Sequence, residues 1–296
     1  VDEGVSAPVV LSALPSSVAE SLEPRLAGEG RLVSSNAASH RMGPVVPLVI
    51  PEVNGGALAS VERQPWHHAG GALVTNPNCV VAGLGLVLAP LQRRWGITAV
   101  TATTMQALSG AGARGPHAVD LLGNVVPFIP GEEEKISAET RKILGIDAPV
   151  AVAVTRVPVM DGHTAHVFLR LGSEADGPAG ADVLRAFRAS PEVAGLPSIP
   201  ERPLRVLDDV DRPQPLRDRQ SGNGMTVSVG RIREVEGGQI ALTMVVHNTI
   251  RGAAGACIAN AELCLARGWR PGRALSSHSA VASASTIPQP PEPACS

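Results

Sequence analysis

The sequence lacks features that would assign it to a membrane or a nucleic acid. Its apolar runs, such as VVAGLGLVLAPL, are interrupted by glycine and proline before they reach the roughly 20 residues of a membrane-spanning helix. It also has no basic stretch, and its formal net charge is −2, which argues against nucleic acid or an anionic membrane as the main partner. Small molecules and other proteins remain as candidate partners.

Cysteine and lysine are scarce. The four cysteines form no CxxC pair, and the N-terminus does not show the order of charged, apolar and small residues that marks a secretory signal. We therefore expect a reducing, cytoplasmic location. Lysine occurs only at Lys135 and Lys142, so each of them invites a functional explanation. The remaining composition, with 44% hydrophobic and 18% charged residues, is that of a folded chain with one or two cores.

The first quarter of the chain alternates between strand and helix patterns. Short apolar runs predict buried strands at 7–14, 31–34, 45–51 and 71–76. Helical spacing follows the first run, and we expect Ser16 or Ser17 to cap that helix and Gly28 to Gly30 to end it. This alternation predicts a parallel α/β arrangement.

Cys79 lies at a predicted junction between a strand and a helix. An apolar helix is expected over 80–95, and a strand rich in β-branched residues over 97–108. Because free N–H groups at a helix N-terminus favour a thiolate, we expect the pKa of Cys79 to be lowered and its sulfur to be nucleophilic. The alternative is a small buried side chain that only fills the core.

The second half of the chain is rich in alternating patterns. Strands are predicted at 149–159, 163–171 and 226–248, the last with a Gly-Gly turn, and they indicate an antiparallel sheet in a second domain. A last helix is expected over 253–268, where Cys257 and Cys264 share one face and are expected to pack in the core. The segment from 271 onward lacks periodicity and is predicted to be disordered.

Two motifs match known sites but do not support them. Residues 110–115 fit G-x-G-x-x-G, yet they lie mid-chain, and a loop whose backbone approaches a ligand explains the glycines equally well. His163 and His166 could be taken for metal ligands, but residues three apart on a strand point to opposite faces. We expect no metal site.

Nine segments, in order along residues 7–268, resemble the aspartate-semialdehyde dehydrogenases of the archaeal and fungal type. They are SALPSSVAESLEP, SSNAASHRM, VPLVIPEVN, TNPNCVVAGL, TTMQALSGAGARG, IPGEEEKISAETRKILG, RVPVMDGHTAHV, RPQPLRDRQSGNGM and HNTIRGAAGA. The resemblance implies an α/β fold: an incomplete Rossmann-like parallel sheet domain plus an α+β catalytic and dimerisation domain. The implied division is 1–78 for the dinucleotide-binding part, 79–247 for the catalytic part, 248–270 for a returning helix and 271–296 for the tail.

The same resemblance implies a reaction. L-aspartyl 4-phosphate would be reduced to L-aspartate 4-semialdehyde with NADP as the cofactor, a step toward lysine, methionine and threonine, in a homodimer or homotetramer. Cys79 would attack the acyl phosphate and hold a thioester. His163, with a pKa near neutrality, would be the general acid and base. Gln106 would orient the intermediate, while Asn78 and the Cys79 N–H would steady an oxyanion.

Binding roles are implied as well. Four residues would hold the substrate: Arg156 its α-carboxylate, Glu132 its ammonium group, and Lys135 and Arg41 its phosphate. Three would touch the nicotinamide side of the cofactor: Ser109, Gly110 and Asn248.

The sequence departs from this family at its start. Members begin with a strand and a glycine-rich turn that holds the cofactor pyrophosphate, whereas the first strand here matches a later one, so on the order of 60 residues are expected to be absent. We expect a fragment or a truncated gene product, with weakened cofactor binding. The alternatives are an acyl-CoA reductase such as malonyl-CoA reductase, acetylglutamyl-phosphate reductase, a non-catalytic remnant and a cysteine hydrolase.

Overall fold

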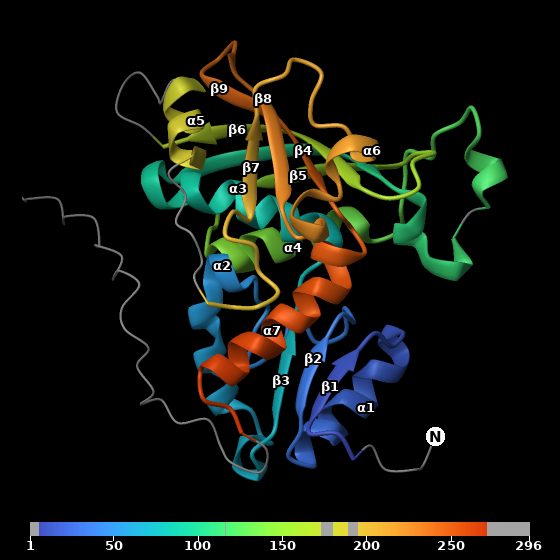
Figure 1. Ribbon diagram of the computed structural model, residues 1–296, viewed down its shortest axis with the longest axis vertical. Coiled ribbons are helices and arrows are strands. Elements are labelled where there is room, and N and C mark those ends of the chain that lie inside the picture. Colours follow the sequence, from blue (N-terminus) through green and yellow to red (C-terminus); the bar gives the residue numbers. More distant parts are fainter. Residues whose placement is uncertain (1–5, 116, 173–179, 189–194, 271–296) are drawn as a thin grey trace, which may run out of the picture.

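The protein is described by a computed structural model that covers residues 6–115, 117–172, 180–188 and 195–270. The predicted disordered tail, 271–296, lies outside the described residues. Two β-sheets lie at opposite ends of the molecule, with helices between them and around them (Figure 1). None of the helices in the described residues is long and apolar enough to cross a membrane.

Sheet A has three parallel strands in the order β1-β2-β3, which confirms the parallel prediction for this part of the chain. Their bounds are β1 Val9–Ser12, β2 Leu32–Ser35 and β3 Ala72–Thr75. Helix α1 (Ser16–Gly28) covers one face and helix α7 (Gly255–Ala266) the other, so the C-terminal helix returns to the first sheet (Figure 1). Because both faces are covered there, β2 and β3 are buried along their whole length, whereas β1 at the edge of the sheet exposes Leu11.

Two local predictions for this region were wrong. Residues 45–51 form no strand. Only Leu48 bridges to Thr75 beside β3, because Pro47 and Pro51 have no N–H group to donate to a ladder. Neither Ser16 nor Ser17 caps α1: Pro15 occupies the N-cap position and no side chain bonds there.

Sheet B has six strands in the order β5-β4-β6-β9-β8-β7. Their bounds are β4 Ile97–Gln106, β5 Val150–Arg156, β6 His163–Leu171, β7 Leu204–Leu207, β8 Val227–Val235 and β9 Gln239–Val246. The expectation of an antiparallel sheet was wrong in part, since β5 runs parallel to β4 and β7 parallel to β8. Helix α4 (Glu132–Leu144) lies between β4 and β5 in the chain, and such a crossover makes its two strands parallel.

The other elements are short. The sequence analysis did not anticipate α2 (Pro51–Asn54), α5 (Gly180–Arg188) and α6 (Pro215–Asp218), nor strand β7. Tight 3₁₀ turns occupy Gly55–Arg63, His67–Ala69, Leu108–Arg114, Ala118–Leu121 and Ser221–Gly224, and a π-turn at Ile250–Ala254 precedes α7. Most of these pieces have too few residues to show a periodicity. Helix α5 is the exception, because its buried residues Val183, Ala186 and Phe187 recur at helical spacing and were overlooked.

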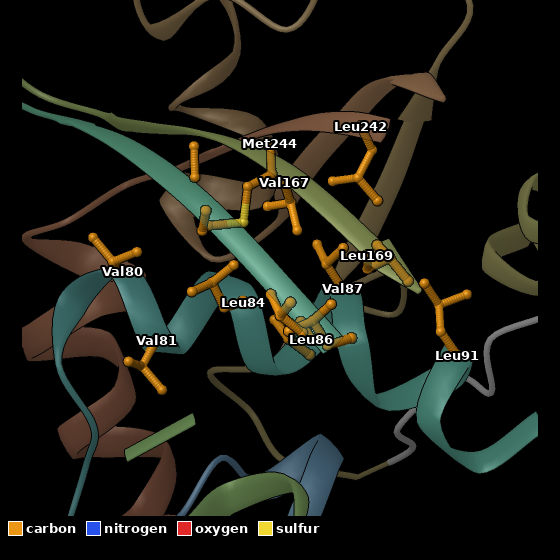
Figure 2. Packing of buried hydrophobic residues seen from close by; sticks show 14 of the residues in the cluster. Val80, Val81, Leu84, Leu86, Val87, Leu91, Val167, Leu169, Leu242 and Met244 are labelled. Atoms are coloured by element: carbon orange, nitrogen blue, oxygen red, sulfur yellow. The ribbon is translucent and has the colours of Figure 1, made fainter. Parts of the chain in front are cut away.

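Helix α3 (Cys79–Trp95) forms the centre of the main core. It lies along one face of sheet B, where Leu84 and Val87 approach side chains of β6 and β9 such as Val167 and Met244 (Figure 2). Gly83 permits a close approach, because a Cβ built there would lie 3.1 Å from the Met244 methyl carbon. This packing fixes the helix against the sheet and therefore fixes the place of its first residue, Cys79.

Truncation inside this core should destabilise the whole chain. Leu84 is fully buried, so Leu84→Ala is expected to lower the free energy of unfolding by about 2 to 5 kcal/mol. The matched control is Val18→Ala on α1, where the side chain is 45% exposed and the change should be small. Urea unfolding followed by circular dichroism measures both. Equal effects of the two variants would contradict the described core.

Candidate active site

The turn from β3 to α3 presents Cys79. The Asn78 side chain caps the helix by accepting a hydrogen bond from the Val80 N–H at 2.9 Å. Cys79 is the first helical residue and is half-buried. The π-turn before α7 closes over it, because a Cβ built on Gly252 would lie 2.6 Å from the Cys79 Cβ. The predicted junction between strand and helix is confirmed, and only glycine fits at position 252.

His163, the first residue of β6, faces the cysteine. Its Nε2 lies 3.1 Å from the Cys79 Sγ, and its Nδ1 accepts a hydrogen bond of 2.9 Å from the Ala107 N–H. Because Nδ1 is an acceptor there, the neutral ring carries its proton on Nε2, the nitrogen that faces the sulfur. The imidazole is fully buried. Nε2, which carries the proton, therefore faces the Cys79 sulfur and is shielded from solvent.

Both members of this pair are held in their neutral forms. Burial, followed by the charge of Glu132, raises the pKa of Cys79 to about 12, against the opposing effects of Arg41, the Val80 N–H and Arg156. Burial, followed by the charges of Arg156 and His247, lowers the pKa of His163 to about 3. The structure thus holds a thiol and a neutral imidazole.

Two expectations about acidity were therefore wrong. The pKa of Cys79 is raised rather than lowered, and that of His163 is far below neutrality. The sequence showed the helix N-terminus but neither the depth of the site nor the nearby carboxylate of Glu132. The Val80 N–H, which was expected to favour a thiolate, also bonds to the Asn78 side chain.

Arg156 ends β5 beside the histidine. Its Nη1 donates a hydrogen bond of 2.7 Å to the Ala107 carbonyl oxygen. A Cβ built on Gly110 would lie 2.8 Å from the His163 Cε1 and 3.0 Å from the Arg156 Nη1. The glycine-rich loop, which follows strand β4 of sheet B, therefore packs its backbone onto these two side chains. This explains why its G-x-G-x-x-G pattern is not a dinucleotide turn.

Glu132 lies on the other side of the cysteine, at the start of α4. Its Oε1 accepts hydrogen bonds from the Asn78 Nδ2 at 2.7 Å and from the Gln106 Nε2 at 3.2 Å. Gln106 and Asn78 are almost fully buried. The predicted residues Asn78, Gln106 and Glu132 thus form one polar cluster next to Cys79.

The two predicted phosphate contacts differ in their surroundings. Arg41 is buried, and its Nη1 donates to Glu139 Oε1 at 3.0 Å while its Nη2 donates to the Asn36 carbonyl at 2.7 Å. Lys135 is exposed on α4. A Cβ built on Gly131 would lie 4.0 Å from the Lys135 Nζ, so the lysine leans over the start of its own helix.

The predicted cofactor residues Ser109, Gly110 and Asn248 lie together beside His163. The Asn248 Nδ2 donates to Ser109 Oγ at 2.8 Å, and the Asn248 Oδ1 accepts from the Gly162 N–H at 2.8 Å.

Sequence reasoning missed Glu139, although its place seven residues after Glu132 on one helix face was a usable signal. It also missed the Ala107 backbone contacts, which have no signature in the sequence.

No group of three or more metal-ligating side chains comes together within the described residues. His163 is buried and His166 exposed, as expected for two positions on opposite faces of one strand.

The sequence matches the family models of the semialdehyde dehydrogenase dimerisation domain, over residues 88–251, and of the semialdehyde dehydrogenase NAD binding domain, over residues 2–61. Aspartate-semialdehyde dehydrogenase from Methanothermobacter thermautotrophicus is 46% identical over 270 residues, which are 86% of this chain and 77% of that protein. The chain belongs to the aspartate-semialdehyde dehydrogenase family. The resemblance noted from the sequence is confirmed.

Solved structures agree with this family. The crystal structure of aspartate semialdehyde dehydrogenase with NADP from Candida albicans superimposes with a TM-score of 0.79 at 37% identity, over 88% of this chain and 78% of that one. The enzyme II complexed with ASA from Vibrio cholerae gives a TM-score of 0.75 at 25% identity, over 88% and 80%. Malonyl CoA reductase (NADP) from Metallosphaera sedula is 32% identical over 88% of this chain and 77% of its own, so the acyl-CoA alternative is not favoured.

The family's dinucleotide cofactor fits the residues present. The carboxyl ends of parallel strands are the usual place for such a ligand, and at that edge of sheet A the buried Ser12 Oγ and Asn76 Oδ1 have no hydrogen-bond partner among the described atoms. Ser109 and Asn248 supply polar groups beside the Cys79–His163 pair. Polar groups thus lie both at the edge of sheet A, where the dinucleotide is expected, and beside the Cys79–His163 pair, where its nicotinamide is expected.

The raised pKa of Cys79 predicts how fast the protein is alkylated at different pH values. With a pKa of about 12, the thiolate fraction should increase about tenfold for each pH unit between pH 6 and 9, without a plateau. Iodoacetamide labelling of Cys79, followed by peptide mass spectrometry, measures the rate. A plateau reached near pH 7 would show a thiolate–imidazolium pair and contradict the assignment of neutral groups.

Proposed function

We propose that this chain interconverts L-aspartyl 4-phosphate and L-aspartate 4-semialdehyde, with NADP as the hydride carrier and phosphate as the leaving or attacking group. The observation that carries the proposal is that the Cys79–His163 pair has a cation and an anion close by. Arg156 bonds to Ala107, which also bonds to His163, and Glu132 bonds to Asn78, the residue before Cys79. An amino acid has a carboxylate and an ammonium group, and this site offers the complementary charge for each.

Arg156 and Glu132 would bind the amino-acid end of the substrate. The guanidinium of Arg156 is buried, and only one hydrogen bond, to the Ala107 carbonyl, is described for it, so it has donors left for a two-point contact with the α-carboxylate. The Glu132 carboxylate would take the ammonium group in place of its weaker amide donors, Asn78 and Gln106. Binding at both ends would set the side-chain carbonyl carbon near the sulfur.

Substrate binding would also activate the nucleophile. The charge of Glu132 helps to raise the pKa of Cys79, and an ammonium group paired with that carboxylate would cancel its effect. Cys79 then attacks the acyl carbon, a C–S bond forms and the C–O bond to phosphate breaks. The thiol proton leaves on the phosphate, so the products of this step are the thioester and hydrogen phosphate.

The second half of the reaction forms the aldehyde. When bound, the cofactor supplies a hydride to the thioester carbonyl carbon. His163 would donate a hydrogen bond from Nε2 to the resulting oxyanion, together with the Cys79 N–H and Asn78, and Gln106 would keep the carbonyl in place. The C–S bond then breaks and releases the semialdehyde and the Cys79 thiolate, which takes up a proton from solvent to become the thiol again. Nδ1 accepts the Ala107 N–H, so Nε2 already carries the ring proton. We therefore assign His163 the role of a hydrogen-bond donor in this step and not that of a base.

Arg41 and Lys135 are proposed to hold the phosphate, and Ser109, Gly110 and Asn248 the nicotinamide side of the cofactor. The division into a dinucleotide-binding part at 1–78, a catalytic part at 79–247 and a returning helix at 248–270 also remains a proposal, and the residues assigned to the phosphate and the cofactor come from all three parts. A homodimer or homotetramer is supported by the open face of sheet B, where Thr101, Thr103 and Phe168 are exposed opposite α3, and by the matched dimerisation domain.

Substitution of the two central residues tests the proposal. Cys79→Ser should lower phosphate-dependent reduction of NADP⁺ with L-aspartate semialdehyde at least about 1000-fold. Arg156→Lys should lower kcat/KM about 100-fold, because lysine cannot make the two-point contact. Arg185→Lys, at an exposed position of α5, is the matched control and should keep full activity. Initial rates are followed by NADPH absorbance.

Two results would refute the proposed reaction. Turnover of malonyl-CoA with NADPH, without turnover of the semialdehyde, would assign the chain to acyl-CoA reduction. Undiminished activity of Cys79→Ser would remove the sulfur from the mechanism.

A further inference from the structure

Glu139 is a buried carboxylate to which the proposed reaction gives no part. It lies on α4, two turns after Glu132, and its side chain is 2% exposed. Its Oε1 accepts a hydrogen bond of 3.0 Å from the Arg41 Nη1, and its Oε2 accepts one of 2.5 Å from the Asn78 backbone N–H. One carboxylate therefore joins the candidate phosphate-binding arginine to the peptide that precedes Cys79.

The rest of α4 strengthens this connection. Glu132 holds the Asn78 side chain while Glu139 holds its backbone, so both ends of Asn78 are bound to one helix. One turn further on, the Lys142 ammonium group donates to the Arg41 and Gly43 carbonyls at 2.6 and 3.0 Å. Lys142 thus holds the backbone of the arginine whose side chain Glu139 holds.

A carboxylate at this buried position needs strong partners. Its removal from water is unfavourable unless charged or well-aligned donors replace the lost hydration. Glu139 meets both requirements, with one guanidinium and one short backbone donor. The Arg41 Nε is left buried without a partner among the described atoms, so one donor of the oriented guanidinium is still available.

We propose that Glu139 is a positioning residue that sets Arg41 for phosphate and holds the Asn78–Cys79 peptide in place for attack. The proposal rests on the proposed function, since it deepens the role of that same site. Through Arg41, Glu139 determines how well phosphate binds. Through the Asn78 N–H, it determines where the sulfur lies relative to that phosphate.

Glu139→Gln tests this idea with the least change of shape. The amide keeps one acceptor but turns an NH₂ donor toward the second partner, so Arg41 and the Asn78 N–H cannot both be satisfied. We expect the KM for phosphate to increase about tenfold and kcat to fall about 10- to 100-fold. The KM for L-aspartate semialdehyde should change less than about twofold, because Arg156 and Glu132 are untouched. The matched control is Glu134→Gln, an exposed carboxylate on the same helix, and it should change none of these values.

A second readout does not depend on turnover. Inorganic phosphate should protect Cys79 from iodoacetamide, and in Glu139→Gln the phosphate concentration for half-protection should rise about tenfold. In the Arg41→Lys background, Glu139→Gln should add little to that concentration, because the two residues act as one unit. Circular dichroism and thermal unfolding of each variant show whether it is folded.

The outcomes separate the two proposals. Loss of kcat with an unchanged KM for phosphate and unchanged protection would show that Glu139 only supports the fold, and would overturn this inference. Absence of turnover in the unmodified chain, with protection that still depends on Glu139, would contradict the proposed reaction and leave the positioning role standing. Absence of phosphate protection in the unmodified chain would overturn the role of Glu139 in phosphate binding.

Discussion

The hydrogen bonds between helix α4 and Asn78 are the contacts on which the rest of the site depends. Glu132 and Glu139 bind the side chain and the backbone of this one residue, and Asn78 in turn caps the helix that begins at Cys79. Packing of α3 against sheet B then fixes the direction in which the cysteine points. Without these contacts, the turn between β3 and α3 would be an ordinary loop, free to carry its sulfur away from His163.

Burial of the reacting pair creates the chemical character of the site. A thiol and an imidazole that were exposed at a helix N-terminus would titrate near neutrality, whereas here both are held neutral. Reactivity therefore has to come from the substrate, whose ammonium group would compensate Glu132. Such a site presents little reactive thiolate to other electrophiles, and it would favour attack on molecules that bring a positive charge to Glu132.

Much of the site was predicted through the resemblance to a known family, which implied a role for each of its residues, whereas physical reasoning from the residues alone reached only Cys79. The parallel first sheet and the position of Cys79 before α3 followed from hydrophobic periodicity. The acidity of Cys79 did not follow, because it depends on burial and on Glu132, which is distant in the chain. The segment at 45–51 was misread because its apolar residues conceal the effect of Pro47 on strand pairing. Glu139 escaped notice because both of its partners, the Arg41 guanidinium and the Asn78 N–H, are distant from it in the chain.

The central claim is that burial and the charge of Glu132 together keep Cys79 protonated, and that an ammonium group paired with Glu132 removes the second of these two effects. The most direct measurement is a titration of the thiolate by its ultraviolet absorbance, with the Cys79→Ser signal subtracted, with and without a non-reactive amino-acid phosphonate. We predict that the phosphonate lowers the pKa of Cys79 in the unmodified chain, and that Glu132→Gln starts from a lower pKa which the phosphonate shifts much less. An unchanged pKa of Cys79 on binding, or an equal shift in both proteins, would contradict the account.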